Sequence, residues 1–396
     1  MQGPPDKRTL APLVILLLVG ITTACAAVES ETPSGRTRTY YIAADEVLWD
    51  YAPSGTDQIA GAPFDEVANM WVVTGDERIG RKYKKSLYRE YTDATFETLK
   101  ARSPQWEHLG FLGPLLRAEV GDTFRAVFKN NTRYPASLHP HGVFYKKNSE
   151  GAVYADGTKD ADRADGAIRP GGTYTYEWPV PERAGPGAGE PSSAFWMYHS
   201  HVHEVEDVNA GLIGPMIVTV RGQARPDGSP LDVDRELVVA FAEVDENVSW
   251  YLDDNIRSFA GKPGVVTKKY GWGPNRQVQG PCNVFEPFCS SNVKDSLNGY
   301  LYGNLPMLNV MVGERVRWYL MSSTNFEIHA PHWHGNTVHA QHMRTDVASL
   351  LPMGMLVADM VPDNPGTWLF HCHVGPHLMA GMQARYTVEP QHLTGR

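Results

Sequence analysis

The chain carries the stretch His371-Cys372-His373-Val374-Gly375-Pro376-His377 near its carboxyl end, and Met382 follows five residues later. A cysteine thiolate, an imidazole five residues away and a thioether ten residues away match a His₂Cys copper site with a weak axial methionine. This ligand pattern predicts blue copper. His371 and His373 flank Cys372 on what we expect to be a strand, where neighbouring side chains point to opposite faces. These two histidines therefore bind something else, on the far side of the strand.

Three more His-x-His pairs lie upstream. This spacing places both imidazoles of a pair on one face of a strand. The pairs are His139 with His141, His199 with His201, and His332 with His334. With His371 and His373 they supply enough nitrogen ligands for a cluster of three copper ions. His329 remains as the second imidazole of the blue-copper site.

Longer stretches of the chain resemble the multicopper oxidases, and within them the ceruloplasmin and hephaestin group. The stretches are HLGFLGPLLRAEVGD at 108–122, GLIGP at 211–215 and VDENVSWYLDDN at 244–255. Those proteins have six cupredoxin domains, whereas this chain has room for two, as in the small-laccase type. The resemblance implies an all-β protein made of two cupredoxin-like Greek-key β-sandwich domains.

The resemblance also implies four copper ions per chain: one type 1, one type 2 and a type 3 pair. The implied type 1 ligands are His329, Cys372, His377 and the axial Met382. The implied type 2 ligands are His139 and His332, and the implied type 3 ligands are His141, His199, His201, His334, His371 and His373. Tyr145 and Glu150 lie near positions where similar proteins have a tyrosine and an acid, so they are candidates for a redox and a proton-relay role. The alternative is an ordinary core tyrosine and a surface glutamate.

The first 26 residues have the features of a signal peptide. Lys7 and Arg8 precede an apolar run from Leu10 to Ile21, which is too short to span a bilayer, and small residues follow at 24–26. We expect cleavage after Ala26 and export to the periplasm or the cell exterior, and cleavage before Cys25 with lipidation of that cysteine is the alternative. In such a compartment Cys282 and Cys289 are expected to form a disulfide.

Composition indicates a globular protein, with 42% hydrophobic and 20% charged residues and a formal net charge of −9. The acidic balance argues against nucleic acid or an anionic membrane as partner. No membrane span is expected. After the signal peptide, the length suggests two domains of ordinary size.

Short β-rich runs separated by glycine and proline fill residues 36–222 and 236–390, the two expected cupredoxin domains. The expected strands include Thr39–Ile42, Met70–Val73, Thr123–Lys129, Thr173–Trp178, Met216–Val220, Glu236–Glu243, Arg315–Met321 and Thr367–Phe370. A linker is predicted at Gly222–Asp234. Residues 261–293 fit no strand pattern and are interpreted as an inserted loop.

The two halves differ at one decisive position. The first has His199-Ser200-His201 where the second has His371-Cys372-His373. A hydroxyl cannot replace a thiolate as the soft ligand of a blue-copper site. We therefore expect a mononuclear copper in the second domain alone. His203 follows His201 by two residues, and we expect it to support the site or to lie on the surface.

The sequence is compatible with three kinds of electron donor: a phenol, cuprous ion and ferrous ion. Ceruloplasmin-like ferroxidases have an acid directly before the second type 1 histidine, but this chain has Pro376 there, which weakens the case for ferrous ion. Carboxylates that lie elsewhere in the sequence are Glu243, Asp245, Glu246 and Asp346. Thioethers that suit cuprous ion are Met343, Met353, Met355, Met360 and Met379.

The sequence thus predicts an oxidase that passes electrons from a small reductant to dioxygen through type 1 copper and a trinuclear cluster. One alternative is a copper nitrite reductase, which needs only three imidazoles at its catalytic copper and carries its cysteine in the first domain. Another is a non-enzymatic copper-binding module. Because each predicted domain holds half of a cluster, we expect a homotrimer with clusters between subunits.

Overall fold

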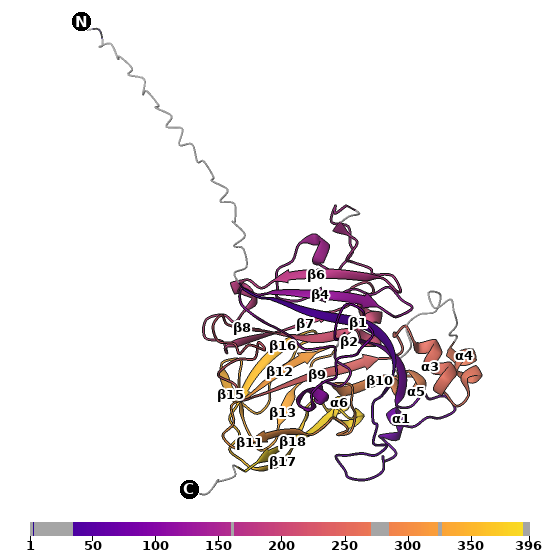
Figure 1. Ribbon diagram of the computed structural model, residues 1–396. Coiled ribbons are helices and arrows are strands. Elements are labelled where there is room, and N and C mark those ends of the chain that lie inside the picture. Colours follow the sequence, from indigo (N-terminus) through magenta and orange to yellow (C-terminus); the bar gives the residue numbers. More distant parts are fainter. Residues whose placement is uncertain (1–2, 4–34, 160–161, 271–284, 324–326, 391–396) are drawn as a thin grey trace. The chain divides into compact units, whose positions relative to one another are not determined.

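The computed structural model describes residue 3 and residues 35–159, 162–270, 285–323 and 327–390. Within these ranges the chain is mainly β-structure, and its strands form four sheets joined by loops and short helices (Figure 1). The sheets belong to two β-sandwiches, so the predicted fold class is confirmed.

The first sandwich consists of two four-stranded sheets among the described residues. One sheet has the order β2 (Lys82–Tyr91), β1 (Thr37–Asp50), β4 (Thr123–Asn130), β6 (Thr173–Pro179). The other has the order β3 (Leu116–Glu119), β8 (Ile213–Thr219), β7 (Ser193–His199), β5 (His139–Pro140). Strand β4 shows why these segments form a sandwich: Phe124, Ala126 and Phe128 alternate with more exposed residues and are fully buried in the core.

The second sandwich repeats this plan with an extension. Its larger sheet has the order β10 (Val293–Leu297), β9 (Arg235–Asp245), β12 (Val316–Ser322), β16 (Met355–Met360), β14 (Val338–Ala340), β15 (Met343–Thr345). Its smaller sheet has the order β11 (Leu308–Met311), β18 (Gln383–Glu389), β17 (Gly366–Cys372), β13 (Pro331–Trp333). The parallel pair β1 and β4 of the first sandwich corresponds to the parallel pair β9 and β12 of the second. The parallel pair β3 and β8 likewise corresponds to β11 and β18. The exact limits 36–222 and 236–390 stay a prediction.

The two sandwiches share an apolar cluster that includes Phe195 and Ile217 from the first and Val238 and Tyr319 from the second. Buried ion pairs cross the same contact. Arg117 binds Glu236 with both terminal nitrogens at 2.9 and 2.8 Å, and the Nζ of Lys85 lies 2.5 Å from Glu246 Oε1. Each charge in these pairs is compensated by its partner, which a buried charge requires.

Short helices correct two of the strand and loop predictions. Helix α1 (Asn69–Val72) occupies the predicted strand Met70–Val73, and the predicted loop at 261–293 holds α4 (Pro263–Tyr270), α5 (Pro287–Ser291) and the first residue of β10. Helix α3 (Leu252–Phe259) precedes this segment. Helices of four to eight residues are too short to show a helical period, and packing in a shared apolar cluster stabilises them instead. The remaining helical elements are α2 (Glu204–Ala210), α6 (Gly375–Ala380), η1 (Pro104–Leu109), η2 (Lys147–Ser149) and η4 (Glu182–Ala184).

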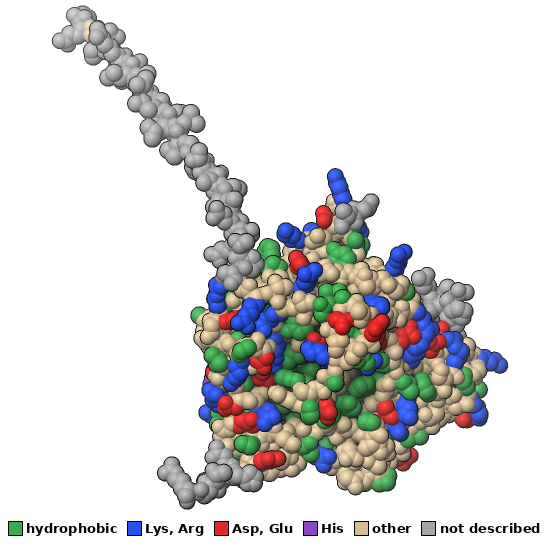
Figure 2. All heavy atoms as spheres, in the orientation of Figure 1, with side chains coloured by type: hydrophobic (Ala, Val, Ile, Leu, Met, Phe, Trp, Pro, Cys, Tyr) green, Lys and Arg blue, Asp and Glu red, His purple; other side chains and the backbone are tan. Residues whose placement is uncertain are grey.

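The face shown in Figure 2 mixes acidic and basic side chains and exposes hardly any histidine. None of the helices within the described ranges has the length and hydropathy that a membrane span requires. Cys289 is disulfide-bonded. Its predicted partner Cys282 lies outside the described residues, and so does the predicted signal peptide, including Cys25, apart from residue 3.

Candidate metal centres

The predicted mononuclear site comes together in the second sandwich. Cys372 ends β17 and is fully buried, and its Sγ lies 3.8 Å from Nδ1 of His329 and 3.5 Å from Nδ1 of His377. Metal–ligand bonds of roughly 2 Å in a trigonal plane separate the ligand atoms by roughly 3.5 Å, so the three atoms fit one ion. Met382 is fully buried, and its carbonyl accepts a hydrogen bond from the Cys372 N–H at 3.2 Å. The methionine is therefore held beside the same ligand.

A separate histidine group lies on the other face of β17. His371 is opposite His332 in the pairing of β17 with β13, and its Nε2 is 3.1 Å from Nδ1 of His332 and 3.1 Å from Nε2 of His334. The ring of His373 lies 5.1 Å from the ring of His332, centre to centre. We call these four residues, His332, His334, His371 and His373, the second half-site.

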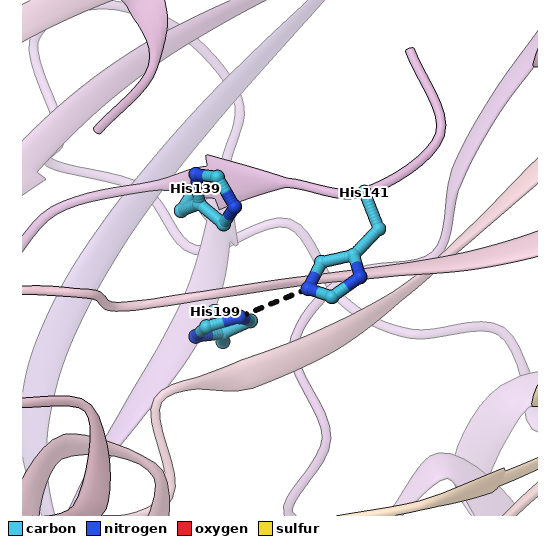
Figure 3. Close-up of side chains that lie close together, drawn as sticks. All are labelled: His139, His141 and His199. Carbon is cyan, nitrogen blue, oxygen red and sulfur yellow. Dashed lines mark hydrogen bonds between the residues drawn. The ribbon is translucent and has the colours of Figure 1, made fainter. Parts of the chain in front are cut away.

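The first sandwich holds an equivalent group, the first half-site, which consists of His139, His141, His199 and His201. His139 is opposite His199 in the pairing of β5 with β7. Figure 3 shows His139, His141 and His199 converging, with Nε2 of His141 3.0 Å from Nε2 of His199. The ring centre of His201 lies 5.1 Å from that of His139.

Burial keeps most of these imidazoles neutral, which is the form that binds metal. It lowers the pKa of His141 to about 4 and the pKa values of His199 and His329 to about 3. Burial also lowers the pKa values of His139, His332, His371 and His377. The pKa of the Cys372 thiol is raised by burial, so a bound cation is needed to favour the thiolate.

Tyr145 and Glu150 both lie beside the first half-site. The Tyr145 ring is 5.9 Å from the ring of His139, and Nδ1 of His139 is 2.6 Å from the Glu150 carbonyl oxygen. The Glu150 carboxylate is buried and turns instead to Lys147 and to the Tyr154 hydroxyl at 2.9 Å. Its backbone therefore orients the His139 ring, and the alternative of a surface glutamate is wrong.

His203 does not join the half-site rings. The centre of its ring lies 5.2 Å from that of Trp250, and its backbone N–H donates a hydrogen bond to Oδ2 of Asp207 at 3.1 Å. It therefore supports the segment that follows His201, which agrees with the first of the two roles expected from the sequence.

One group near the mononuclear site includes a residue that the sequence did not single out. Asp295 lies opposite Glu243 in the antiparallel pairing of β10 with β9. Ligand atoms of Glu243, Asp295 and His377 all lie within 4.8 Å of one another. Burial, followed by the charge of Glu327, raises the pKa of Asp295 to about 7. No motif marks Asp295, because only the strand register brings it to His377.

The methionines that could bind cuprous ion differ in their burial. Met360 is 1% exposed and belongs to the core, whereas Met343 and Met379 are 59% and 60% exposed. Met353 and Met355 pack against the cluster between the sandwiches.

Two family profiles, both described as multicopper oxidase, match the chain at residues 107–223 and 279–392. Together they include every histidine of both half-sites and the Cys372 site. The chain belongs to the multicopper oxidase family. Its membership agrees with the three ligand groups, whose donor atoms fit copper.

Relatives within this family are much longer proteins. The human ferroxidase HEPHL1 is 42% identical over 97% of this chain and 31% of its own length. Human hephaestin is 40% identical over 90% of this chain and 30% of its own length. Human ceruloplasmin is 40% identical over 89% of this chain and 32% of its own length. The chain spans about a third of each of these relatives.

Solved multicopper oxidase structures have the same fold. One multicopper oxidase crystal structure aligns with a TM-score of 0.54 at 20% identity, over 90% of this chain and 91% of the other. The multicopper oxidase mgLAC aligns with a TM-score of 0.55 at 20% identity, over 91% and 88%. These alignments support cupredoxin-like sandwiches and carry no information on substrate.

Proposed function

We propose that this protein oxidises a small reductant one electron at a time at a type 1 copper and reduces dioxygen to water at a trinuclear copper cluster. Four copper ions per chain, bound at the positions described above, supply that redox chemistry. The observation that carries the proposal is the opposite orientation of neighbours on β17. Cys372 faces His329 and His377, while His371 faces His332 and His334. Consecutive residues therefore join the two sites through the backbone.

The protein residues prepare this path by burial. His329 and Cys372 are 2% and 0% exposed, which excludes water from the site that accepts the electron. Ala330 donates its N–H to Cys372 Sγ at 3.4 Å, and such a contact stabilises the thiolate. Tyr145 remains the proposed redox residue beside His139, and Glu150 remains the proposed proton-relay residue, with its carbonyl on His139 and its carboxylate on Lys147 and Tyr154.

The cluster itself requires a second copy of the chain. Among the described residues, the ring contacts and hydrogen bonds that join one half-site histidine to another stay within a single half-site. Exposed apolar side chains flank the first half-site: Phe144, Val153 and Val205 are 50%, 45% and 38% exposed. Such side chains suit a protein contact. We therefore propose a homotrimer in which the first half-site of one chain meets the second half-site of the next, a head-to-tail contact that closes after three copies.

The proposed reductant is a reduced metal ion, with ferrous ion favoured. Glu243 and Asp295 offer hard oxygen ligands beside His377, and these replace the acid that is missing at Pro376. Asp295 Oδ1 is buried and has no hydrogen-bond partner among the described residues. A cation there would both satisfy that oxygen and lie next to a ligand of the type 1 copper. The names of the relatives include ferroxidases, which agrees with this choice.

The test is oxygen uptake by copper-loaded protein with ferrous ion, cuprous ion and an electron-rich phenol measured side by side. We expect the highest kcat/KM with ferrous ion. A higher value with the phenol would overturn the choice of reductant but leave the oxidase intact. Two coppers per chain together with nitrite reduction would instead favour the copper nitrite reductase, and four coppers without oxygen uptake would favour a binding module. Export remains a prediction from the first 26 residues.

A further inference from the structure

Backbone hydrogen bonds show which residues of the first sandwich stand where the type 1 ligands stand in the second. In the second sandwich the N–H of Cys372 donates to the carbonyl of Met382 at 3.2 Å. In the first, the N–H of Ser200 donates to the carbonyl of Leu212 at 3.1 Å. Ser200 is therefore the counterpart of Cys372, and Leu212 is the counterpart of Met382.

The same comparison pairs Asp207 with His377. The N–H of Met382 donates to the His377 carbonyl at 3.0 Å, and the N–H of Leu212 donates to the Asp207 carbonyl at 3.0 Å. Asp207 lies on α2 and His377 on α6, and each helix ends at a glycine in the left-handed conformation. A carboxylate thus stands in the first sandwich where an imidazole ligand stands in the second.

Both oxygens of the Asp207 carboxylate are engaged, and the residue is fully buried. Its Oδ2 accepts hydrogen bonds from the Ser200 hydroxyl at 2.6 Å and from the His203 N–H at 3.1 Å. Its Oδ1 accepts a hydrogen bond from Nε1 of Trp250, in the segment between β9 and α3, at 2.8 Å. Hydrogen bonds to a charged acceptor in a buried site are among the strongest that a protein makes.

These contacts reach the histidines of the first half-site. Ser200 lies between His199 and His201, and its Oγ accepts a hydrogen bond from the N–H of Ser137 at 3.1 Å. The Ser137 hydroxyl oxygen in turn accepts a hydrogen bond from the N–H of His201 at 3.0 Å. The orientation that Asp207 gives to the Ser200 hydroxyl therefore fixes the backbone that carries two copper ligands.

We infer that Asp207 is a positioning residue for the cluster. Its hydrogen bond with Ser200 joins the end of β7 to helix α2, as a bound copper would join Cys372 at the end of β17 to His377 on α6. Through Trp250 it also anchors the first half-site to the segment that follows β9. The inference rests on the proposed function, because the position of His199 and His201 matters only if they bind copper.

The test compares Asp207→Ala and Ser200→Ala with the conservative Ser200→Thr, which keeps the hydroxyl. The matched control is Asp122→Ala, since Asp122 is a buried carboxylate of the same sandwich that binds Arg38 and the Glu119 N–H. We expect Asp207→Ala and Ser200→Ala to keep the blue absorption of the type 1 site while cluster copper affinity falls roughly tenfold or more and the type 2 electron-spin resonance changes. Ser200→Thr and Asp122→Ala should keep both signals. Retention of the cluster signals in Asp207→Ala would overturn the inference, even if its Tm falls.

Hydrogen exchange makes the outcome independent of the copper chemistry. Backbone amides of residues 199–203 should exchange faster in Asp207→Ala and Ser200→Ala than in Asp122→Ala. Equal exchange in all three variants would contradict the positioning role. A wild-type protein that lacks a type 2 signal would count against the proposed function instead, and the exchange comparison would then decide the role of Asp207 alone.

Discussion

His332 lies directly opposite His371 in the pairing of β13 with β17, and its Nδ1 is 3.1 Å from Nε2 of His371. The next residue along β17, Cys372, points to the other face and lies against His329 and His377. One strand therefore contributes to both candidate metal sites. Because the ligands of the two sites are distinct, each site can be removed without the other.

We expect Cys372→Ser to abolish the intense blue absorption and to remove one of four coppers per chain, because a hydroxyl is a poor ligand for this site. The type 2 electron-spin resonance should persist. Metal analysis and absorption spectroscopy measure both effects. Met382→Leu is the control, since it changes only the weak axial ligand and should keep the blue colour. Loss of all copper in Cys372→Ser would show that the sites depend on each other.

Removal of either carboxylate beside His377 should affect ferrous ion selectively. We expect Glu243→Gln and Asp295→Asn to raise the KM for ferrous ion roughly tenfold and to leave phenol oxidation unchanged. Because burial raises the pKa of Asp295 to about 7, wild-type KM for ferrous ion should rise as pH falls below 7, and Asp295→Asn should lose this dependence. Glu177→Gln, at an exposed glutamate in the first sandwich, serves as control. Equal losses with ferrous ion and phenol would place the effect at the type 1 copper instead.

The sequence reveals those site residues whose geometry is local. The spacing of His139 and His141 predicts a shared face because residues two apart on a strand share one, and the ring centres lie 5.6 Å apart even though His141 follows the last residue of β5. Asp295 was missed because only the register of β10 against β9 brings it to its site. Asp207 was missed because, although it lies only seven residues after Ser200, no motif marks it and its contact with Ser200 depends on how α2 folds back on the end of β7. Helix α1 was missed for a related reason, since its conformation depends on burial of Val72 in a cluster formed by distant segments.

Acid should weaken the contact between the sandwiches through His108. This residue is 4% exposed, its Nε2 accepts a hydrogen bond from the Val238 N–H at 3.2 Å, and its Nδ1 lies 2.9 Å from the Gln105 carbonyl oxygen. Burial lowers its pKa from 6.5 to about 4. Below pH 6.5 the unfolded chain binds a proton at His108, whereas the folded chain binds it only near pH 4. The free energy of unfolding therefore falls as pH drops through this window.

The difference between 6.5 and about 4 is worth roughly 3 kcal/mol for one group. His108→Gln removes this titration, so we expect its Tm to fall less than the wild-type Tm between pH 6.5 and pH 4.5. The other histidines are common to both proteins and cancel in the comparison. His342→Gln, at an exposed histidine, is the control and should follow the wild type. An identical acid response of His108→Gln and wild type would contradict this account.

Mixed trimers test whether the clusters lie between subunits. One variant, His199→Ala with His201→Ala, lacks two ligands of the first half-site, and the other, His371→Ala with His373→Ala, lacks two ligands of the second. Each variant alone has no intact cluster and should be inactive. If the first half-site of one chain meets the second half-site of the next, some contacts in a reassembled mixture bring together two intact half-sites. Oxygen uptake should then return in part after the variants are unfolded or dissociated together, reassembled and loaded with copper.

Each variant reassembled alone is the control. If every cluster were built within one chain, all chains in the mixture would carry a broken site, and no mixing ratio would restore oxygen uptake. Recovery should also depend on protein concentration, because ligands drawn from two chains bind copper only when the chains are docked.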